Sequence, residues 1–263
     1  MSFIEQIKQR AKQEIKTIVL PEATDVRILE AAEMIKNEGY AKVILIGNEE
    51  EVRKLAKERN IDIGETKIID PAVSIETARY SKELYELRKS KGMTEEQAEK
   101  LVLEPVYFGM MMVKLNEADG LVSGAAHSTS DTLRPALQIL KTAPGTKLVS
   151  AFFVMVVPNC KYGENGTFIF ADSGLNEEPD SEKLSEIAIS SSKSFEQLVG
   201  TQPKVAMLSY STYGSAHSAS TEKVIEATKL VKEKEPNLLV DGELQLDAAI
   251  IPEVAEFKAK GSP

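Results

Sequence analysis

The sequence has 263 residues, enough for one large or two modest domains. Its 32 Lys and Arg against 41 Asp and Glu give a net charge of −9, and 42% of the residues are hydrophobic. This composition supports a buried core without disulfides and does not favour binding to nucleic acid or to an anionic membrane surface. With 1 Cys an intrachain disulfide is excluded, and with 2 His a structural zinc site is not expected. Any anion site must therefore be local, built from a few cations and backbone amides.

The first residues have the pattern of an amphipathic helix, without the apolar core of a signal peptide. No apolar run approaches the roughly 20 residues that a membrane span needs. We therefore expect a cytoplasmic protein that does not bind membranes or nucleic acids, and that holds no metal and no bound cofactor.

The first half of the chain alternates short apolar runs with helical patterns. Gly39 is expected to end one helix and Asn48 to cap the next, which turns Val52 inward. The expected strands are 17–20, 42–46, 67–70 and 118–123, and the expected helices are 25–37, one after Asn48, two or three between 75 and 115, and one over 133–140. Such alternation predicts parallel strands covered on both faces, with sites at their carboxyl ends.

The second half predicts a mixture of strand pairs and helices. A long buried strand over 148–157 is expected to pair with 167–171 across a turn. Strands are expected at 204–208 and 238–240, and helices at 181–198 and 221–234. No internal repeat is evident, and a Pro-Gly turn predicts two domains, 1–145 and 146–263. The chain ends directly after a helical pattern, which fits either a further element or a frayed terminus.

The most informative stretch covers residues 120–135, GLVSGAAHSTSDTLRP. A strand is followed by small residues, three consecutive hydroxyls and then a helix. Pro135 is suited to the first helical position, which would place Arg134 at the helix N-terminus. Hydroxyls, free N–H groups and a guanidinium would then converge on a phosphate or carboxylate. The alternative is that the hydroxyls cap the helix and Arg134 is a solvated charge.

A second hydroxyl-rich stretch, 207–216, also leaves a strand and leads to a helix. Its Ser209 and Ser211 are candidate residues for the opposite wall of a cleft, and the alternative is a polar loop. The acidic stretch 241–247 could form a pocket wall, a metal site or a solvated turn, of which we expect the turn.

Four further residues are candidates on local grounds only. Cys160 lies in a turn beside Lys161, and a lone cysteine is more often inert than nucleophilic. His127 and His217 are in loops without an evident acid to orient them. Arg88 has the pattern of a solvated helical charge.

Several of these segments resemble the phosphate acetyltransferase family. They are LPEATDVRILEAA at 20–32, SGAAHSTSDTLRPALQI at 123–139, FADSGLNEEPD at 170–180, MLSYSTYGSA at 207–216 and DGELQLDAAI at 241–250, in the family's order. The resemblance implies two α/β domains with a cleft between them, related to isocitrate and isopropylmalate dehydrogenases. It also implies a homodimer that interconverts acetyl-CoA plus phosphate with acetyl phosphate plus CoA, with CoA as substrate.

Carried over position by position, the resemblance assigns Arg134 to binding the phosphoryl group and makes Arg88 a second arginine that lines the substrate-binding cleft. It places Ser128 and Thr129 in the loop that faces acetyl phosphate, and makes Cys160 a residue near the site that forms no acyl-enzyme.

Two departures from the family pattern limit this transfer. The family continues beyond the equivalent of Pro263, and that part holds a Ser-Arg pair and an Asp assigned to catalysis. We therefore expect a C-terminally shortened chain with little activity alone, and we assign no catalytic residue within it. Tyr213 and His217 also stand where the family often has Lys. The alternatives are a phosphate butyryltransferase and a non-catalytic domain of this fold that binds acetyl-CoA or acetyl phosphate.

Overall fold

The computed structural model describes residues 2–263, and its contacts divide the chain into two compact units. Unit 1 ends at Lys141, and unit 2 is Thr142–Pro263. The domain boundary expected from the sequence lies a few residues later, in the same Pro-Gly segment. Each unit is described separately.

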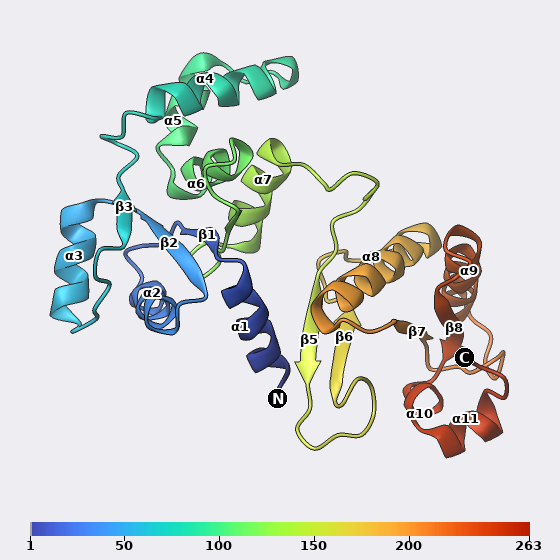
Figure 1. Ribbon diagram of the computed structural model, residues 1–263. Coiled ribbons are helices and arrows are strands. Elements are labelled where there is room, and N and C mark those ends of the chain that lie inside the picture. The colour runs from blue at the N-terminus through green and yellow to red at the C-terminus, as the bar shows by residue number, and fades with distance from the viewer. Residues whose placement is uncertain (1) are drawn as a thin grey trace. The chain divides into compact units, whose positions relative to one another are not determined.

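Unit 1 is built on a parallel sheet of 4 strands in the order β3-β2-β1-β4 (Figure 1). The strands are β1 (Lys16–Leu20), β2 (Ala41–Ile46), β3 (Lys67–Ile69) and β4 (Gly120–Leu121). The helices are α1 (Phe3–Gln13), α2 (Val26–Glu38), α3 (Glu49–Glu58), α4 (Thr77–Arg88), α5 (Glu95–Val102), α6 (Pro105–Lys114) and α7 (Thr129–Ile139), with a 3-10 turn at Lys89–Lys91. The expected parallel α/β organisation is confirmed, although β4 is only 2 residues long.

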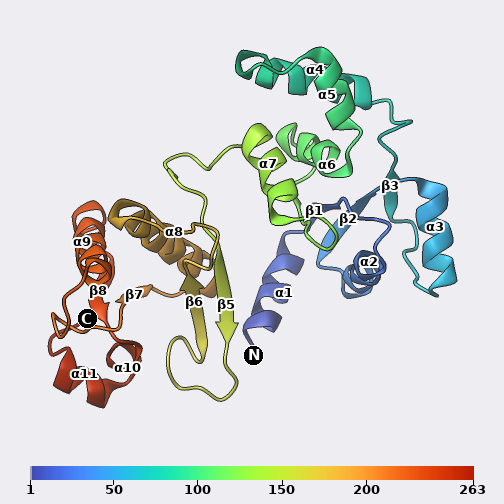
Figure 2. The ribbon, with the colours of Figure 1, turned by 180° about the vertical axis from the view of Figure 1, so that it is seen from behind.

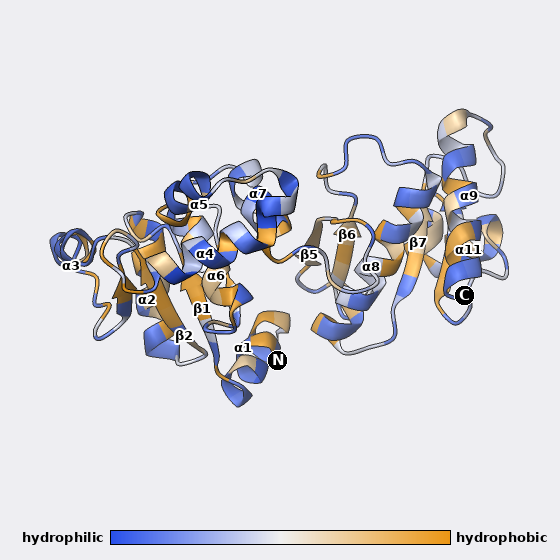
Figure 3. Cartoon of the chain, turned by 90° about the horizontal axis from the view of Figure 1, so that it is seen from above, coloured by the Kyte–Doolittle hydropathy of each residue, from blue (hydrophilic) through white to orange (hydrophobic). Residues whose placement is uncertain are grey.

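Both faces of this sheet are covered, because successive strand residues point to opposite sides. Val19 and Ile44 pack into a core formed with α4 to α7. Leu20 and Leu45, one position further along each strand, pack with α2 and α3 instead. The hydropathy colouring in Figure 3 shows the apolar strands between these helices. Gly109 lets α6 approach closely, since a Cβ there would lie 2.6 Å from a methyl of Leu121.

Local signals set the helix ends as expected. Asp25 caps α2 by accepting the N–H of Arg27, and Asn48 caps α3 by accepting that of Glu51. Gly39 ends α2 in the left-handed conformation, at φ 69°.

The strand order creates a switch point in unit 1. The chain moves from β1 to β2 and β3 in one direction, and β4 then pairs with the other edge of β1. The loops that leave β1 and β4 therefore start side by side at the carboxyl edge of the sheet. Open α/β sheets bind their ligands at such a position.

Unit 2 contains two separate strand pairs (Figure 2). Strands β5 (Phe152–Val156) and β6 (Thr167–Ala171) are antiparallel, and β7 (Lys204–Leu208) and β8 (Leu239–Leu244) are parallel. The helices are α8 (Ser181–Val199), α9 (Ala219–Lys234), α10 (Leu246–Ile250) and α11 (Pro252–Lys258). Helices α8 and α9 pack on β7 and β8 around Met207, Val224 and Val240.

Two sequence expectations for unit 2 are wrong. The long buried strand over 148–157 is shorter and open to solvent, with Phe153 62% exposed, because within residues 2–263 β5 pairs with β6 alone. The solvated turn expected from 241 is the end of β8, where Asp241 and Glu243 are buried. Both carboxylates are kept in the interior by hydrogen bonds, described below.

Among residues 2–263, no helix is long and apolar enough to cross a membrane. Over the same range, no cluster of three or more His, Cys, Asp and Glu side chains is placed to hold a metal ion.

Candidate functional site

A buried carboxylate organises the loop that follows β4. Glu22 lies in the loop after β1, and its side chain is 1% exposed. One oxygen accepts the N–H groups of Gly124 and Ala125 at 3.0 and 2.9 Å, and the other accepts those of Ala126 and His127 at 2.7 Å each. Burial by itself would raise the pKa of Glu22, but these hydrogen bonds outweigh it and lower the pKa to about 2. The loop is thus wrapped around an anion that belongs to the chain itself.

The same segment holds the loop by a second contact. Arg27 donates to the carbonyl oxygen of Ala125 and pairs with Asp25 at 2.6 Å. The two stretches at 20–32 and 123–139, noticed separately in the sequence, therefore form one assembly at the switch point of the sheet.

His127 has an orienting acid, contrary to the sequence expectation. Its Nδ1 lies 2.8 Å from Glu22, and its side chain remains 32% exposed. Glu22 is about one hundred residues away in the chain, so no local pattern could reveal this pair.

Helix α7 begins earlier than expected, and this corrects the placement of Arg134. Ser128 is the N-cap and accepts the N–H of Asp131, so Pro135 lies inside the helix and Arg134 stands in its second turn. Ser128 prevails as the start because its hydroxyl satisfies an orphan N–H group, which Pro135 cannot do. The loop amides of 124–127 are occupied by Glu22, so the donors left for an external anion are the first N–H groups of α7, at Thr129 and Ser130.

The charges of Arg88 and Arg134 both act on the side chain of Tyr107. Burial raises the pKa of Tyr107, while the charges of both arginines act on its hydroxyl in the opposite direction. The hydroxyl donates to Gln138 at 2.9 Å. Arg88 is half-buried, and within residues 2–263 its buried Nε has no hydrogen-bond partner. A solvated helical charge is therefore the wrong description of Arg88: it carries a donor that is still to be satisfied beside the exposed guanidinium of Arg134.

The hydroxyl-rich stretch of unit 2 is held from within by a second buried carboxylate. Ser211 is fully buried and donates to Glu243 at 2.9 Å, and the N–H of Gly214 donates to the same oxygen at 2.6 Å. Asp241 accepts from the hydroxyl of Tyr213 and pairs with Lys232 at 3.1 Å. Ser211 thus holds the loop together rather than lining an open surface.

Cys160 lies in the connection between β5 and β6 and is half-buried. Its sulfur is 4.0 Å from the carbonyl oxygen of Tyr162, and the Nζ of Lys161 sits over the Tyr162 ring at 5.3 Å. The ammonium group of Lys161 therefore faces the aromatic ring of Tyr162.

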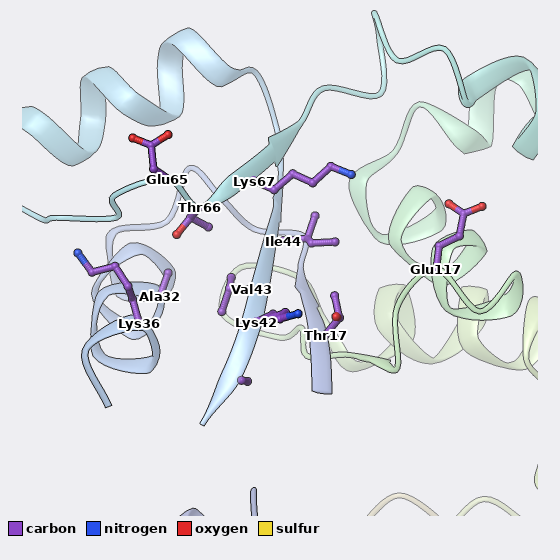
Figure 4. Close-up of a pocket in the computed structure, with 11 residues that line it drawn as sticks. Thr17, Ala32, Lys36, Lys42, Val43, Ile44, Glu65, Thr66, Lys67 and Glu117 are labelled. Carbon is purple, nitrogen blue, oxygen red and sulfur yellow. The ribbon is translucent and has the colours of Figure 1, made fainter. Parts of the chain in front are cut away.

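A hollow of about 700 Å³ opens at the other edge of the unit 1 sheet, where its strands begin (Figure 4). It is lined by Thr17, Ala32, Lys36, Ala41, Lys42, Val43, Ile44, Glu65, Thr66, Lys67 and Glu117. Lys36 is paired with Asp62 at 2.6 Å, and Glu117 with Arg79. Charges of both signs therefore line this hollow.

Sequence reasoning missed three residues of this arrangement, Glu22, Tyr107 and Gln138. It also missed a local repeat: residues 124–130 read GAAHSTS and residues 214–220 read GSAHSAS. Comparing the surroundings of the two His residues would have revealed this repeat, although not the carboxylates that hold the two loops.

The fold and the loop define the class of open parallel α/β proteins, in which ligands commonly bind at the switch point of the sheet and anions at helix N-termini. The family model described as phosphate acetyl/butaryl transferase matches residues 2–263. The chain belongs to this family of acyltransferases.

Individual relatives agree with this assignment. A phosphate acetyltransferase of Acetivibrio thermocellus is 65% identical over 262 residues, covering 100% of this chain and 78% of that protein. The solved EutD phosphotransacetylase from Staphylococcus aureus has a TM-score of 0.89 and 44% identity, over 99% of this chain and 78% of that one. A phosphotransacetylase from Streptococcus pyogenes has a TM-score of 0.90 and 39% identity, over 99% and 77%.

Proposed function

We propose that this chain takes part in reversible acetyl transfer between acetyl phosphate and CoA. Support comes from the relatives named phosphate acetyltransferase, one of them 65% identical. The observation that carries the proposal is that the buried Nε of Arg88 has no hydrogen-bond partner within residues 2–263, while the charges of Arg88 and Arg134 both act on Tyr107. The isocitrate dehydrogenase-like arrangement of two domains is part of this proposal, carried by the resemblance alone.

The reaction requires a group that stabilises the departing phosphate. The thiolate sulfur of CoA attacks the acetyl carbonyl carbon and forms a C–S bond. The C–O bond to phosphate then breaks, and its electron pair leaves on the phosphate oxygen. In our proposal Arg88 and Arg134 balance that charge, while the first N–H groups of α7, beside Ser128 and Thr129, bind another phosphoryl oxygen.

Acyl preference and activity are tested together by one assay. CoA-dependent transfer from acetyl phosphate and from butyryl phosphate is measured, with binding of each followed by calorimetry. We expect acetyl phosphate to be preferred. Faster transfer from butyryl phosphate would favour the phosphate butyryltransferase alternative, and binding without turnover would favour the non-catalytic domain.

We also propose a cytoplasmic homodimer. The exposed apolar side chains of the β5–β6 pair, Phe153 at 62% and Phe170 at 47%, are of the kind that a partner surface covers. Light scattering at several concentrations checks the mass, and a monomer throughout would contradict the proposal.

A further inference from the structure

We infer that Glu22 is a positioning residue for the phosphoryl subsite, acting by shaping the loop before α7 and by fixing His127 with its Nε2 left open. The inference rests on the proposed function, because it assigns this role to the loop that the proposal gives to acetyl phosphate.

The first argument is the geometry of the amides. Four consecutive N–H groups, from Gly124 to His127, converge on one carboxylate. Successive amides of this kind form a concavity that commonly binds an external anion. Here the concavity is filled from inside by a side chain that is 1% exposed. The next donors along the chain, at the start of α7, are thereby left for a ligand at a position that Glu22 determines.

The second argument concerns the imidazole. An ionised carboxylate can only accept, so the Nδ1 of His127, 2.8 Å from Glu22, must carry a proton. In the neutral ring Nε2 then has the free lone pair, and in the charged ring it is a donor. Within the described chain, no hydrogen bond to Nε2 is found. The ring is partly exposed and precedes the Ser128 cap, so Nε2 is free to meet a ligand of this loop.

The two roles that Glu22 could have predict opposite effects of Glu22→Gln on phosphate affinity. A negative charge beside an anion site weakens anion binding by repulsion. If Glu22 acted only as a charge, Glu22→Gln would strengthen phosphate binding. If Glu22 positions the donors, the same change weakens binding, because a carboxamide turns its NH₂ towards some of the loop N–H groups and can donate to Nδ1.

The experiment measures two properties of Glu22→Gln in the full chain. Calorimetry with inorganic phosphate gives affinity, and ¹⁵N NMR of the His127 ring gives the protonated nitrogen. We expect phosphate affinity to fall at least about fivefold and the Nδ1–H form to lose its dominance. Glu117→Gln is the matched control, since Glu117 also accepts side-chain hydrogen bonds in unit 1, but in the turn between α6 and β4. It should leave both readings unchanged.

Glu22→Asp tests for rescue and covers the case in which Glu22→Gln does not fold. Asp keeps the charge and the acceptors on a shorter side chain, so it should retain the Nδ1–H form and recover part of the affinity. Unchanged or stronger phosphate binding by Glu22→Gln would overturn the inference. So would a Glu22→Asp variant with no Nδ1–H preference.

Failure of the proposed function is distinguishable from failure of this inference. If the parent binds no phosphate and Arg134→Gln changes nothing, the phosphoryl site itself is wrong and the positioning role falls with it. If the parent binds phosphate through Arg134 but Glu22→Gln leaves the phosphate affinity unchanged, only the positioning role is wrong.

Discussion

The loops at 124–130 and 214–220 have nearly the same sequence and the same place between a strand and a serine-capped helix, yet they differ in what holds them. Each follows a strand, β4 or β7, and leads to a helix capped by serine, Ser128 or Ser218. In each, the cap hydroxyl meets the serine two residues later, at 2.8 Å in the first loop and 3.0 Å in the second.

The anchoring carboxylates make different contacts. Glu22 receives four loop amides and the ring of His127, whereas Glu243 receives one amide and the hydroxyl of Ser211. His217 is exposed, and in the described part of the chain its ring has no hydrogen bond. The same motif therefore gives one oriented imidazole and one free imidazole, because the anchor decides the state of the ring.

The two loops also differ in their cations. Every arginine of the sequence lies within residues 1–141. In unit 2, Lys232 is already paired with Asp241 beside the loop. Among residues 2–263, the helix after the first loop carries Arg134, whose guanidinium is suited to planar, bidentate recognition of a phosphoryl group. The comparison teaches that the same loop motif is held by different internal contacts in the two units, and the proposed function gives an anion site to the first loop alone.

The largest expected effect is the acid sensitivity that Glu22 confers. Its pKa falls from 4.5 in the unfolded chain to about 2 in the folded one. The resulting stability, on the order of 3 kcal/mol, is complete above pH 4.5 and is lost as the pH falls towards 2. Denaturant unfolding of parent and Glu22→Gln from pH 2 to 6 measures this. We expect the difference in unfolding free energy between parent and variant to shrink as the pH falls from 6 to 2. A difference that is the same at every pH would show that Glu22 is not the internal anion of the loop.

The second largest effect is expected for Arg134, the residue that distinguishes the first loop from the second. A charge-assisted hydrogen bond contributes about 1.5–3 kcal/mol, so Arg134→Gln should weaken phosphate binding by roughly 10- to 200-fold. CoA binding should change far less, and Arg134→Lys should restore only part of the loss. Calorimetric titration measures each affinity. Arg53→Gln, which removes a surface pair with Glu49 in α3, is the control. A phosphate affinity within about twofold of that of the parent would show that Arg134 is a solvated surface charge.

The parallel sheet of unit 1 was predictable because its signals are local. Apolar runs, the Asp25 and Asn48 caps and the glycine after α2 each act within a few residues. The start of α7 was misplaced because two local signals competed, and Ser128 prevailed over Pro135.

The site was predictable only in part because its decisive contacts are distant in sequence. Glu22 and His127 are joined across the switch point, and the charges of Arg88 and Arg134 both act on Tyr107, although the three residues lie in α4, α7 and α6. Residues at 241–243 looked solvated because acids rarely enter a core without partners, and those partners come from the loop after β7.

Glu243→Gln sharpens the comparison from the unit 2 side. The amide can still accept from Ser211, but its buried NH₂ gains no acceptor. We therefore expect the free energy of unfolding to fall by about 1–3 kcal/mol. Denaturant unfolding measures this, and the ring signals of His127 should stay unchanged. A shifted His127 tautomer would mean that the two anchors are not independent.

The smallest expected effect is that of Cys160, which lies in neither loop. A catalytic thiol needs a base or a cation, and its neighbour Lys161 is turned to the ring of Tyr162. If transfer from acetyl phosphate to CoA is direct, Cys160→Ala should keep most of the kcat of an active parent, with only a minor loss of stability from a half-buried position. Turnover is measured together with mass spectrometry of the acid-quenched protein. A loss of several orders of magnitude, with an acetyl thioester trapped on Cys160 of the parent, would establish covalent catalysis and move the chemistry to the β5–β6 connection.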